Sequence, residues 1–146
     1  MAIFPLILAA LAGLALAVQA AVNARLREGV GDPYWATAIQ SIVGLLALGA
    51  ALVVVRPAVS VAAIARAPWW AMTGGVLGVT FLMLSIVLLP RLGVTLLLAG
   101  VIVGQLLGGM LIDHYGWFDV ARHAVSPWRL AGVVLLLAGV ALIRAN

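Results

Sequence analysis

The stretch Val94–Ile112, with the sequence VTLLLAGVIVGQLLGGMLI, contains no charged residue over its 19 positions. A helix needs about 20 mainly apolar residues to cross a bilayer core of about 30 Å. The rest of the chain has the same character, because hydrophobic residues make up 66% of its 146 positions and charged residues only 8%. A soluble domain of this size needs far more polar surface. The sequence therefore predicts an integral membrane protein.

Five apolar stretches of this kind follow one another, separated by short segments that hold most of the charges. They lie at about 3–23, 34–55, 69–89, 94–112 and 128–143. We predict a single all-α transmembrane domain over 1–146 with five membrane-spanning helices. Asp32 and Pro33 are suited to begin the second helix as N-cap and first helical residue. The link Pro90–Gly93 is so short that the third and fourth helices are expected to be antiparallel neighbours.

The basic residues are eight arginines, with no lysine, and they give a formal net charge of +4. In a soluble domain this charge would suggest a nucleic-acid partner. Here the arginines are scattered at the ends of apolar stretches, where such side chains anchor helices in the headgroup region. We therefore expect contact with the lipid bilayer and none with nucleic acid.

The arginines show no preference for one side of the membrane. With a cytoplasmic N-terminus, four would lie inside and four outside. The inside set is Arg56, Arg66, Arg122 and Arg129, and the outside set is Arg25, Arg27, Arg91 and Arg144. An excess of positive charge normally marks the cytoplasmic side, so two interpretations remain open. Either the first helix or a partner sets the orientation, or the chain inserts both ways and pairs with an inverted copy of itself.

Glycines recur at helical spacing on the third and fourth stretches. They are Gly74, Gly75 and Gly78 on the third stretch, and Gly100, Gly104 and Gly108 on the fourth. Small residues on one face let two helices approach closely in lipid, so we predict helix packing at these faces. Such faces would also permit the sliding between two packings that alternating access requires.

Four amides lie within or at the end of the apolar stretches. Gln19 and Asn23 share one face of the first helix, Gln40 with Ser41 lies early in the second, and Gln105 lies in the fourth. An amide that faces lipid leaves its polar atoms unpaired, so these groups should point into the bundle. They either form hydrogen bonds between helices or line a pathway for a polar substrate. Both interpretations remain open.

Asp113 and His114 follow the fourth stretch directly and place an acid beside an imidazole at the membrane edge. One interpretation is an anchored helix end in which Asp113 pairs with a nearby arginine. The other is a coupling or substrate-contact site, because acids and histidines at membrane depth serve in proton relays. Under the second interpretation, Asp113→Asn would abolish transport while leaving the fold intact.

The sequence offers no candidate for catalysis or for a bound cofactor or metal. Cysteine is absent, and no metalloprotease, nucleophile-elbow or phosphate-loop motif occurs. We therefore expect no enzyme, no cofactor and no metal site. Because no carboxylate lies in the middle of a stretch, a neutral, zwitterionic or anionic substrate is favoured over a hydrophobic cation.

Short motifs in a characteristic order along the whole chain resemble the YdcZ-type family of inner-membrane exporters within the drug/metabolite transporter (DMT) superfamily. They are Gln19, Asn23 and Leu26; Pro68–Trp70 with Gly74, Gly75 and Gly78; Pro90–Gly93; Gly104 and Gln105; Ile112–Phe118; and Arg129 with Gly132 and Gly139. The family's characteristic positions fall on Gln19, Asn23, Gln105 and Asp113. The resemblance implies a ten-helix bundle of two five-span halves in opposite orientations, whether fused, encoded as a pair or formed by one dual-topology chain.

The sequence and the resemblance together predict a secondary transporter of the bacterial inner membrane that exports a small metabolite or drug-like solute. The pathway would run between two antiparallel protomers and would be lined by Gln19, Asn23, Gln40 and Gln105. The partner would be a second copy of the chain or a paralogous half. The alternative is a structural or regulatory membrane subunit that transports nothing, or one half of a heterodimeric transporter.

Overall fold

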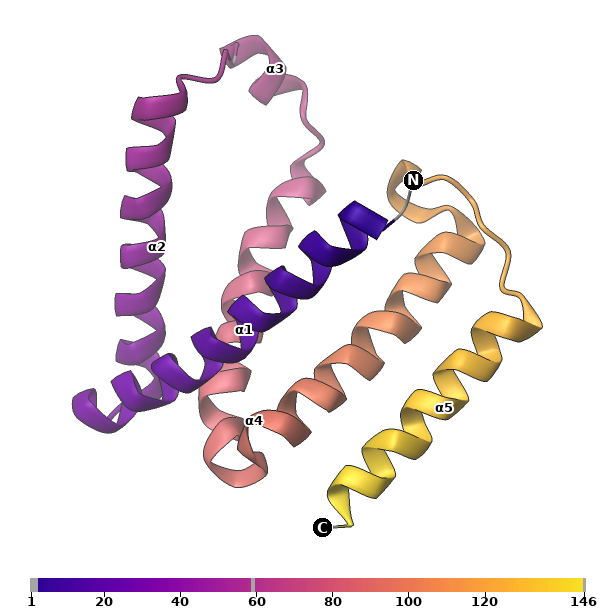
Figure 1. The fold of residues 1–146 in the computed structure, drawn as a ribbon. Coiled ribbons are helices and arrows are strands. Elements are labelled where there is room, and N and C mark those ends of the chain that lie inside the picture. Colours follow the sequence, from indigo (N-terminus) through magenta and orange to yellow (C-terminus); the bar gives the residue numbers. More distant parts are fainter. Residues whose placement is uncertain (1–2, 59, 146) are drawn as a thin grey trace. The chain divides into compact units, whose positions relative to one another are not determined.

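The computed structural model describes residues 3–58 and 60–145, and these contain helices and connecting segments without any strand. Four helical segments in this part of the chain are long and apolar enough to cross a membrane. They are α1 (Ile3–Val30), α2 (Pro33–Val55), the segment Trp69–Tyr115 and α5 (Pro127–Arg144) (Figure 1). The prediction of an all-α protein is confirmed for the described residues. The chain forms two compact units, the first ending at Pro90 and the second beginning at Arg91.

In the first unit, α1 extends seven residues beyond the predicted end of its apolar stretch. It ends at Val30, and the next residue, Gly31, has a φ of 82° and donates its N–H to the carbonyl oxygen of Arg27 at 2.7 Å. Glycine adopts this left-handed conformation without a steric penalty, so it often follows the last helical turn. Hydropathy therefore predicts the part of the helix that is suited to lipid, whereas the left-handed conformation of Gly31 ends the helix itself.

The start of α2 follows the prediction. The Asp32 side chain accepts a hydrogen bond from the Trp35 N–H at 2.9 Å, and Pro33 is the first helical residue. This N-cap satisfies a donor that the first turn of a helix leaves free. After α2 come a short helix, α3 (Val61–Arg66), and a 3-10 turn, η1 (Trp69–Met72), neither of which was expected.

Helix α4 (Thr73–Tyr115) has 43 residues and is interrupted at Gly93, where φ is 72° and ψ is 166°. At 1.5 Å per residue an unbroken helix of this length would measure about 65 Å, roughly twice a bilayer core. Gly93 divides it into the segments 73–92 and 94–115. This break lies within the predicted link Pro90–Gly93, although the helix continues through Pro90 and only Gly93 departs from helical geometry. The count of five spans and the antiparallel placement of these two segments stay predictions.

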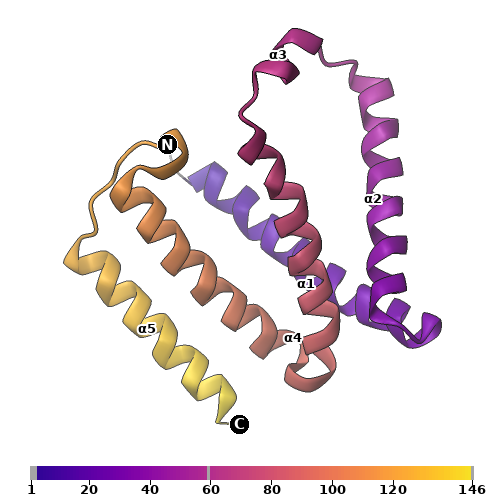
Figure 2. The same ribbon diagram turned by 180° about the vertical axis from the view of Figure 1, so that it is seen from behind.

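Few of the described apolar side chains are buried in the first unit. They are Ala20 and Ala24 of α1, Ala36 of α2 and Ile86 of α4. Helices α1 and α2 contact one another and are joined by a short turn (Figures 1 and 2). Farther along α2, large apolar side chains stand free, with Leu45 68% exposed and Val54 82% exposed. A long series of exposed apolar side chains indicates a surface that contacts lipid or another helix.

In the second unit, the segment 94–115 of α4 and helix α5 run side by side in opposite directions (Figures 1 and 2). The segment between them contains a 3-10 turn, η2 (Trp117–Asp119). Ser126 caps α5 by accepting the Arg129 N–H at 3.3 Å, and Pro127 is the first helical residue. The predicted fifth stretch and the observed helix agree within one residue at each end.

Candidate functional site

The connection between α4 and α5 is fastened to the end of α4. A helix leaves its last carbonyl groups without intrahelical donors. The carbonyl oxygen of Asp113 accepts the backbone N–H of His123 at 2.8 Å, and that of His114 accepts Nε of Arg122 at 2.8 Å. Gly116 turns the chain out of the helix with a φ of 66°. These bonds hold the connecting segment over the helix end that carries Asp113.

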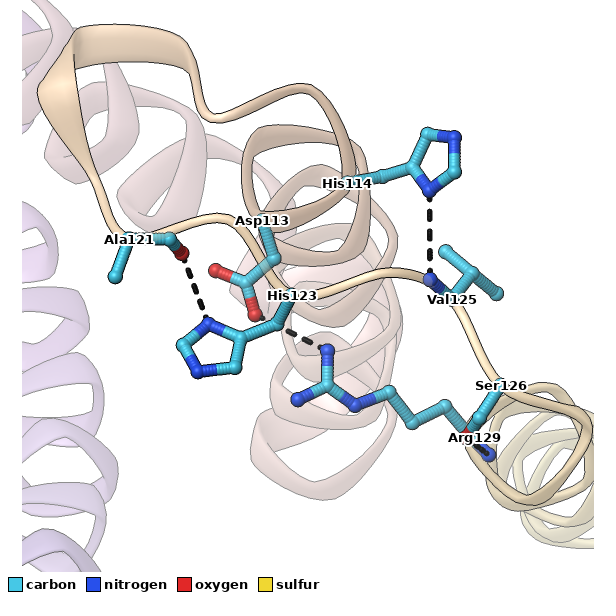
Figure 3. Close-up of polar contacts among 7 residues, drawn as sticks. All are labelled: Asp113, His114, Ala121, His123, Val125, Ser126 and Arg129. Atoms are coloured by element: carbon cyan, nitrogen blue, oxygen red, sulfur yellow. Dashed lines mark hydrogen bonds and ion pairs between the residues drawn. The ribbon is translucent and has the colours of Figure 1, made fainter.

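Asp113 pairs with an arginine across the two helices of this unit. Its Oδ2 lies 3.4 Å from Nη1 of Arg129, and the side chains are 36% and 41% exposed (Figure 3). A partly exposed pair of this kind contributes about 0–1 kcal/mol to stability. The helix-end pairing considered for Asp113 is therefore present, while its role in coupling or substrate contact stays a prediction.

His114 does not join Asp113 in one site. Its Nδ1 accepts the backbone N–H of Val125 at 3.4 Å, and the ring points away from the ion pair (Figure 3). In the same connection, Nδ1 of His123 donates to the carbonyl oxygen of Ala121 at 2.9 Å. The two residues predicted as a coupling pair are thus neighbours in sequence but make contacts with different parts of the structure.

A groove lies between α4 and α5 beside the ion pair, with a volume of about 450 Å³. The residues that line it are Gln105, Leu106, Gly109, Met110 and Asp113 from α4, and Arg129, Gly132, Val133 and Leu136 from α5. A Cβ atom placed on Gly109 or Gly132 would meet no described atom within 4 Å, so these two glycines leave the groove open. Its walls are mainly apolar, and its charged groups are Asp113 and Arg129.

Sequence reasoning did not identify Arg129 or the α5 side of this groove as part of a site. Arg129 was counted as an anchor at the end of a span and, with Gly132, among the motif residues of the family resemblance. A signal was present, because Arg129, Gly132, Val133 and Leu136 follow the three- and four-residue spacing of one helix face. Gln105, Gly109 and Asp113 show the same spacing on α4. Nothing in the sequence alone indicates that these two faces meet.

Three polar side chains are buried in the first unit. The exposed fraction is 5% for Asn23, 3% for Thr37 and 8% for Ser85. The two hydroxyl groups donate to carbonyl oxygens in the preceding turn of their own helices, Thr37 to Pro33 and Ser85 to Phe81, both at 2.8 Å. The two hydroxyls do not bond to one another, but Oγ1 of Thr37 also lies 3.7 Å from Sδ of Met83 on α4, which is a weak polar contact between helices.

Gln40 and Ser41 continue the same face of α2 one turn farther on. Oε1 of Gln40 and Oγ of Ser41 are buried atoms with no hydrogen-bond partner among the described residues. An unpaired buried polar atom costs about 1–3 kcal/mol, so such atoms normally find a partner. Within the described chain, the expected hydrogen bonds between helices are not formed by these two atoms.

The other predicted residues are distributed over both units. Gln19 is half-buried on α1, in the same unit as Asn23 and Gln40. Gln105 is exposed and belongs to the second unit, where it lines the groove. Whether the four amides form one pathway stays a prediction.

The predicted packing glycines have open space beside them. A Cβ placed on any of them would meet no described atom of its own unit within 4 Å. They are Gly74, Gly75, Gly78, Gly100, Gly104 and Gly108. Close helix contact at these positions therefore stays a prediction for an assembly.

Among the described residues, no group of three or more His, Asp or Glu side chains is arranged to hold a metal ion.

The model of the family described as "Putative inner membrane exporter, YdcZ" matches residues 4–142. No curated protein and no solved structure matches the chain. The matched range covers nearly all of the 146 residues and most of each candidate membrane helix. The chain therefore belongs to the YdcZ family of inner-membrane exporters.

Proposed function

We propose that the chain is one half of a secondary-active exporter and that two copies in opposite orientations enclose the substrate pathway. The family supports the general activity, since its description is that of an inner-membrane exporter. The substrate in this proposal is a small metabolite or drug-like solute. The pathway would include Gln19, Asn23, Gln40 and Gln105.

The observation that carries this proposal is the pair of buried polar atoms without partners on α2. Oε1 of Gln40 and Oγ of Ser41 find no donor among the described residues. Asn23, on the neighbouring helix α1, is also buried. Polar atoms in this state require a substrate, water or a second protein copy to complete their hydrogen bonds. A pathway between two copies would supply all three.

The break at Gly93 supports five spans in place of four. The segments 73–92 and 94–115 would each measure about 30 Å or slightly more, which is one bilayer crossing. An odd number of spans leaves the two termini on opposite sides of the membrane. Together with evenly divided arginines, this favours a chain that inserts both ways, and two inverted copies would then form a ten-helix transporter of the DMT type.

The orientation is tested with two reporters fused to the C-terminus, one active only in the cytoplasm and one only outside it. We expect signal from both when the protein is expressed alone. Signal from a single side would contradict dual topology. A matched variant, Arg56→Gln with Arg66→Gln, removes cations from one side only and should shift the two signals in opposite directions.

Transport is tested by counterflow in liposomes that contain only this chain. Solute exchange across these vesicles supports the proposal, and the thermal stability of the protein provides a ligand screen to find the solute. Exchange that appears only after a second polypeptide is added would assign the chain to a heterodimer or to a non-transporting subunit. Gln40→Leu should abolish exchange, whereas Glu28→Gln, an exposed residue outside the candidate site, should preserve it.

A further inference from the structure

We propose that the groove between α4 and α5 binds a zwitterionic solute with an apolar body, holding its ammonium group at Asp113 and its acidic group at Arg129. This inference rests on the proposed function and names the substrate class of that transporter. It is carried by the groove itself, whose two charged residues have opposite signs and lie on opposite helices.

The ion pair is available to a ligand. The only contact between the two side chains is Nη1 of Arg129 to Oδ2 of Asp113 at 3.4 Å, which is long for a charged hydrogen bond. A guanidinium has five N–H donors, and a carboxylate can accept several hydrogen bonds. Both side chains are more than a third exposed. A ligand can therefore bind each group without removing a well-formed bidentate pair.

The groove has room for an apolar body next to the charges. Its volume of about 450 Å³ falls within the range of about 300–1,000 Å³ that is usual for small-molecule sites. Leu106 and Met110 lie along one side and Val133 along the other, and Gly132 leaves space between them. Gln105 is eight residues before Asp113, which places it about 12 Å away along the helix. This distance limits the length of the ligand.

The charges favour a zwitterion over an ion of one sign. A cation at Asp113 would compete with Arg129 and leave the guanidinium unpaired, and an anion at Arg129 would do the same to the carboxylate. Unpaired charges near an apolar wall are costly. A ligand with both charges replaces the pair with two new pairs and leaves no charge alone. The same chemistry is offered by a free amino acid with an apolar side chain and by the headgroup of a zwitterionic lipid.

The test measures binding to the purified full chain in maltoside micelles by calorimetry. The probes are L-leucine, L-phenylalanine and L-tryptophan, each compared with its N-acetyl derivative, which is an anion, and its amide, which is a cation. At least one parent amino acid should bind about tenfold or more tightly than both derivatives. Equal binding of the three forms in every set overturns the inference, and so does the absence of binding by all of these probes together with lysophosphatidylethanolamine, the zwitterionic lipid probe.

Variants test the two charged residues separately. Asp113→Asn should weaken the zwitterion and reverse the preference toward the N-acetyl anion, whereas Arg129→Gln should reverse it toward the cationic amide. A role in stability alone would reduce binding of all forms equally. Glu28→Gln breaks the exposed Arg25–Glu28 pair, which lies outside the groove, and should leave the preference unchanged. Gly132→Leu fills the groove and should weaken all three forms.

Lysophosphatidylethanolamine distinguishes the two sources of the zwitterion. If it binds with the same dependence on Asp113 and Arg129 while the amino acids do not, the ligand is a lipid; if the amino acids bind, it is a free solute. Failure of the proposed function can be distinguished from failure of this inference. Solute exchange in liposomes without any preference for zwitterions would overturn this inference alone, and zwitterion binding without exchange would overturn the proposed function.

Discussion

Nη1 of Arg27 on α1 donates to the main-chain carbonyl oxygen of Ile86 on α4 at 3.3 Å. Ile86 stands four residues before Pro90, which lies inside the helix and has no N–H to donate to that oxygen. Ile86 is 1% exposed, so water does not easily replace the missing donor. Arg27 therefore supplies a donor where the proline has removed one, and it ties the end of α1 to α4.

We expect Arg27→Gln to lower the free energy of unfolding by about 1 kcal/mol, because the carbonyl of Ile86 loses its charged donor. The loss should be smaller when Pro90→Ala is also present, since alanine restores the backbone N–H. The midpoint of SDS-induced unfolding in mixed micelles measures both effects. Arg25→Gln, which removes an exposed cation of the same helix, serves as control and should change stability little. An equal loss in both backgrounds would contradict the pairing of Arg27 with this proline.

Gly93 is a second position in α4 at which the backbone departs from regular helical hydrogen bonding or geometry. Its φ of 72° and ψ of 166° belong to a region that is almost restricted to glycine. A Cβ there would meet no described atom within 4 Å, so the cost of a side chain is conformational. Gly93→Ala should destabilise the protein by about 1–3 kcal/mol in the same unfolding measurement. Gly44→Ala, in the middle of α2 and also without a neighbour, should be neutral or stabilising. Similar effects of the two variants would contradict a strained break at Gly93.

A local feature of the sequence predicted the start of α2. Asp32 with Pro33 acts within one turn, as Ser126 with Pro127 does at the start of α5, so these starts depend little on distant contacts. The break between the third and fourth stretches was also located, although the helix absorbs Pro90 and only Gly93 departs from it. The predicted span ends at residue 23, whereas helix α1 continues to Val30, because hydropathy indicates the length suited to lipid and not the length of the helix.

The candidate site was predicted only in part, because its contacts join residues that are distant in sequence. An arginine partner for Asp113 was one of the two interpretations of this residue, but which arginine pairs with it depends on how the connection of residues 116–126 folds. That fold is set by hydrogen bonds from His123 and Arg122 to the end of α4. No short sequence motif predicts either hydrogen bond. The groove was not predicted for the same reason. It forms where one face of α4 meets one face of α5, and the sequence indicates each face but not that they meet.

The bond from Arg122 to the carbonyl oxygen of His114 leads to a prediction about this connection. Arg122→Ala should free the connecting segment from the end of α4 while leaving both helices intact. Hydrogen exchange should show faster exchange of the His123 amide, which donates to Asp113. Global stability should fall by about 1 kcal/mol or less, since the side chain is exposed. Unchanged exchange at His123 would mean that the backbone bonds hold the segment without this arginine.

A substitution at Gln40 can distinguish a role in hydrogen bonding between helices from a role in lining a polar substrate pathway. Its Oε1 is buried without a partner in the described chain, so Gln40→Met should leave the free energy of unfolding unchanged or raise it by about 1 kcal/mol. Solute exchange in liposomes should nevertheless fall by about tenfold or more, because the substrate would lose an acceptor. Arg27→Gln, which removes a partnered donor, provides the contrast in the unfolding measurement. If Gln40→Met instead lowers stability by about 1 kcal/mol or more and exchange follows the amount of folded protein, the amide binds a second copy, and the pathway must run elsewhere.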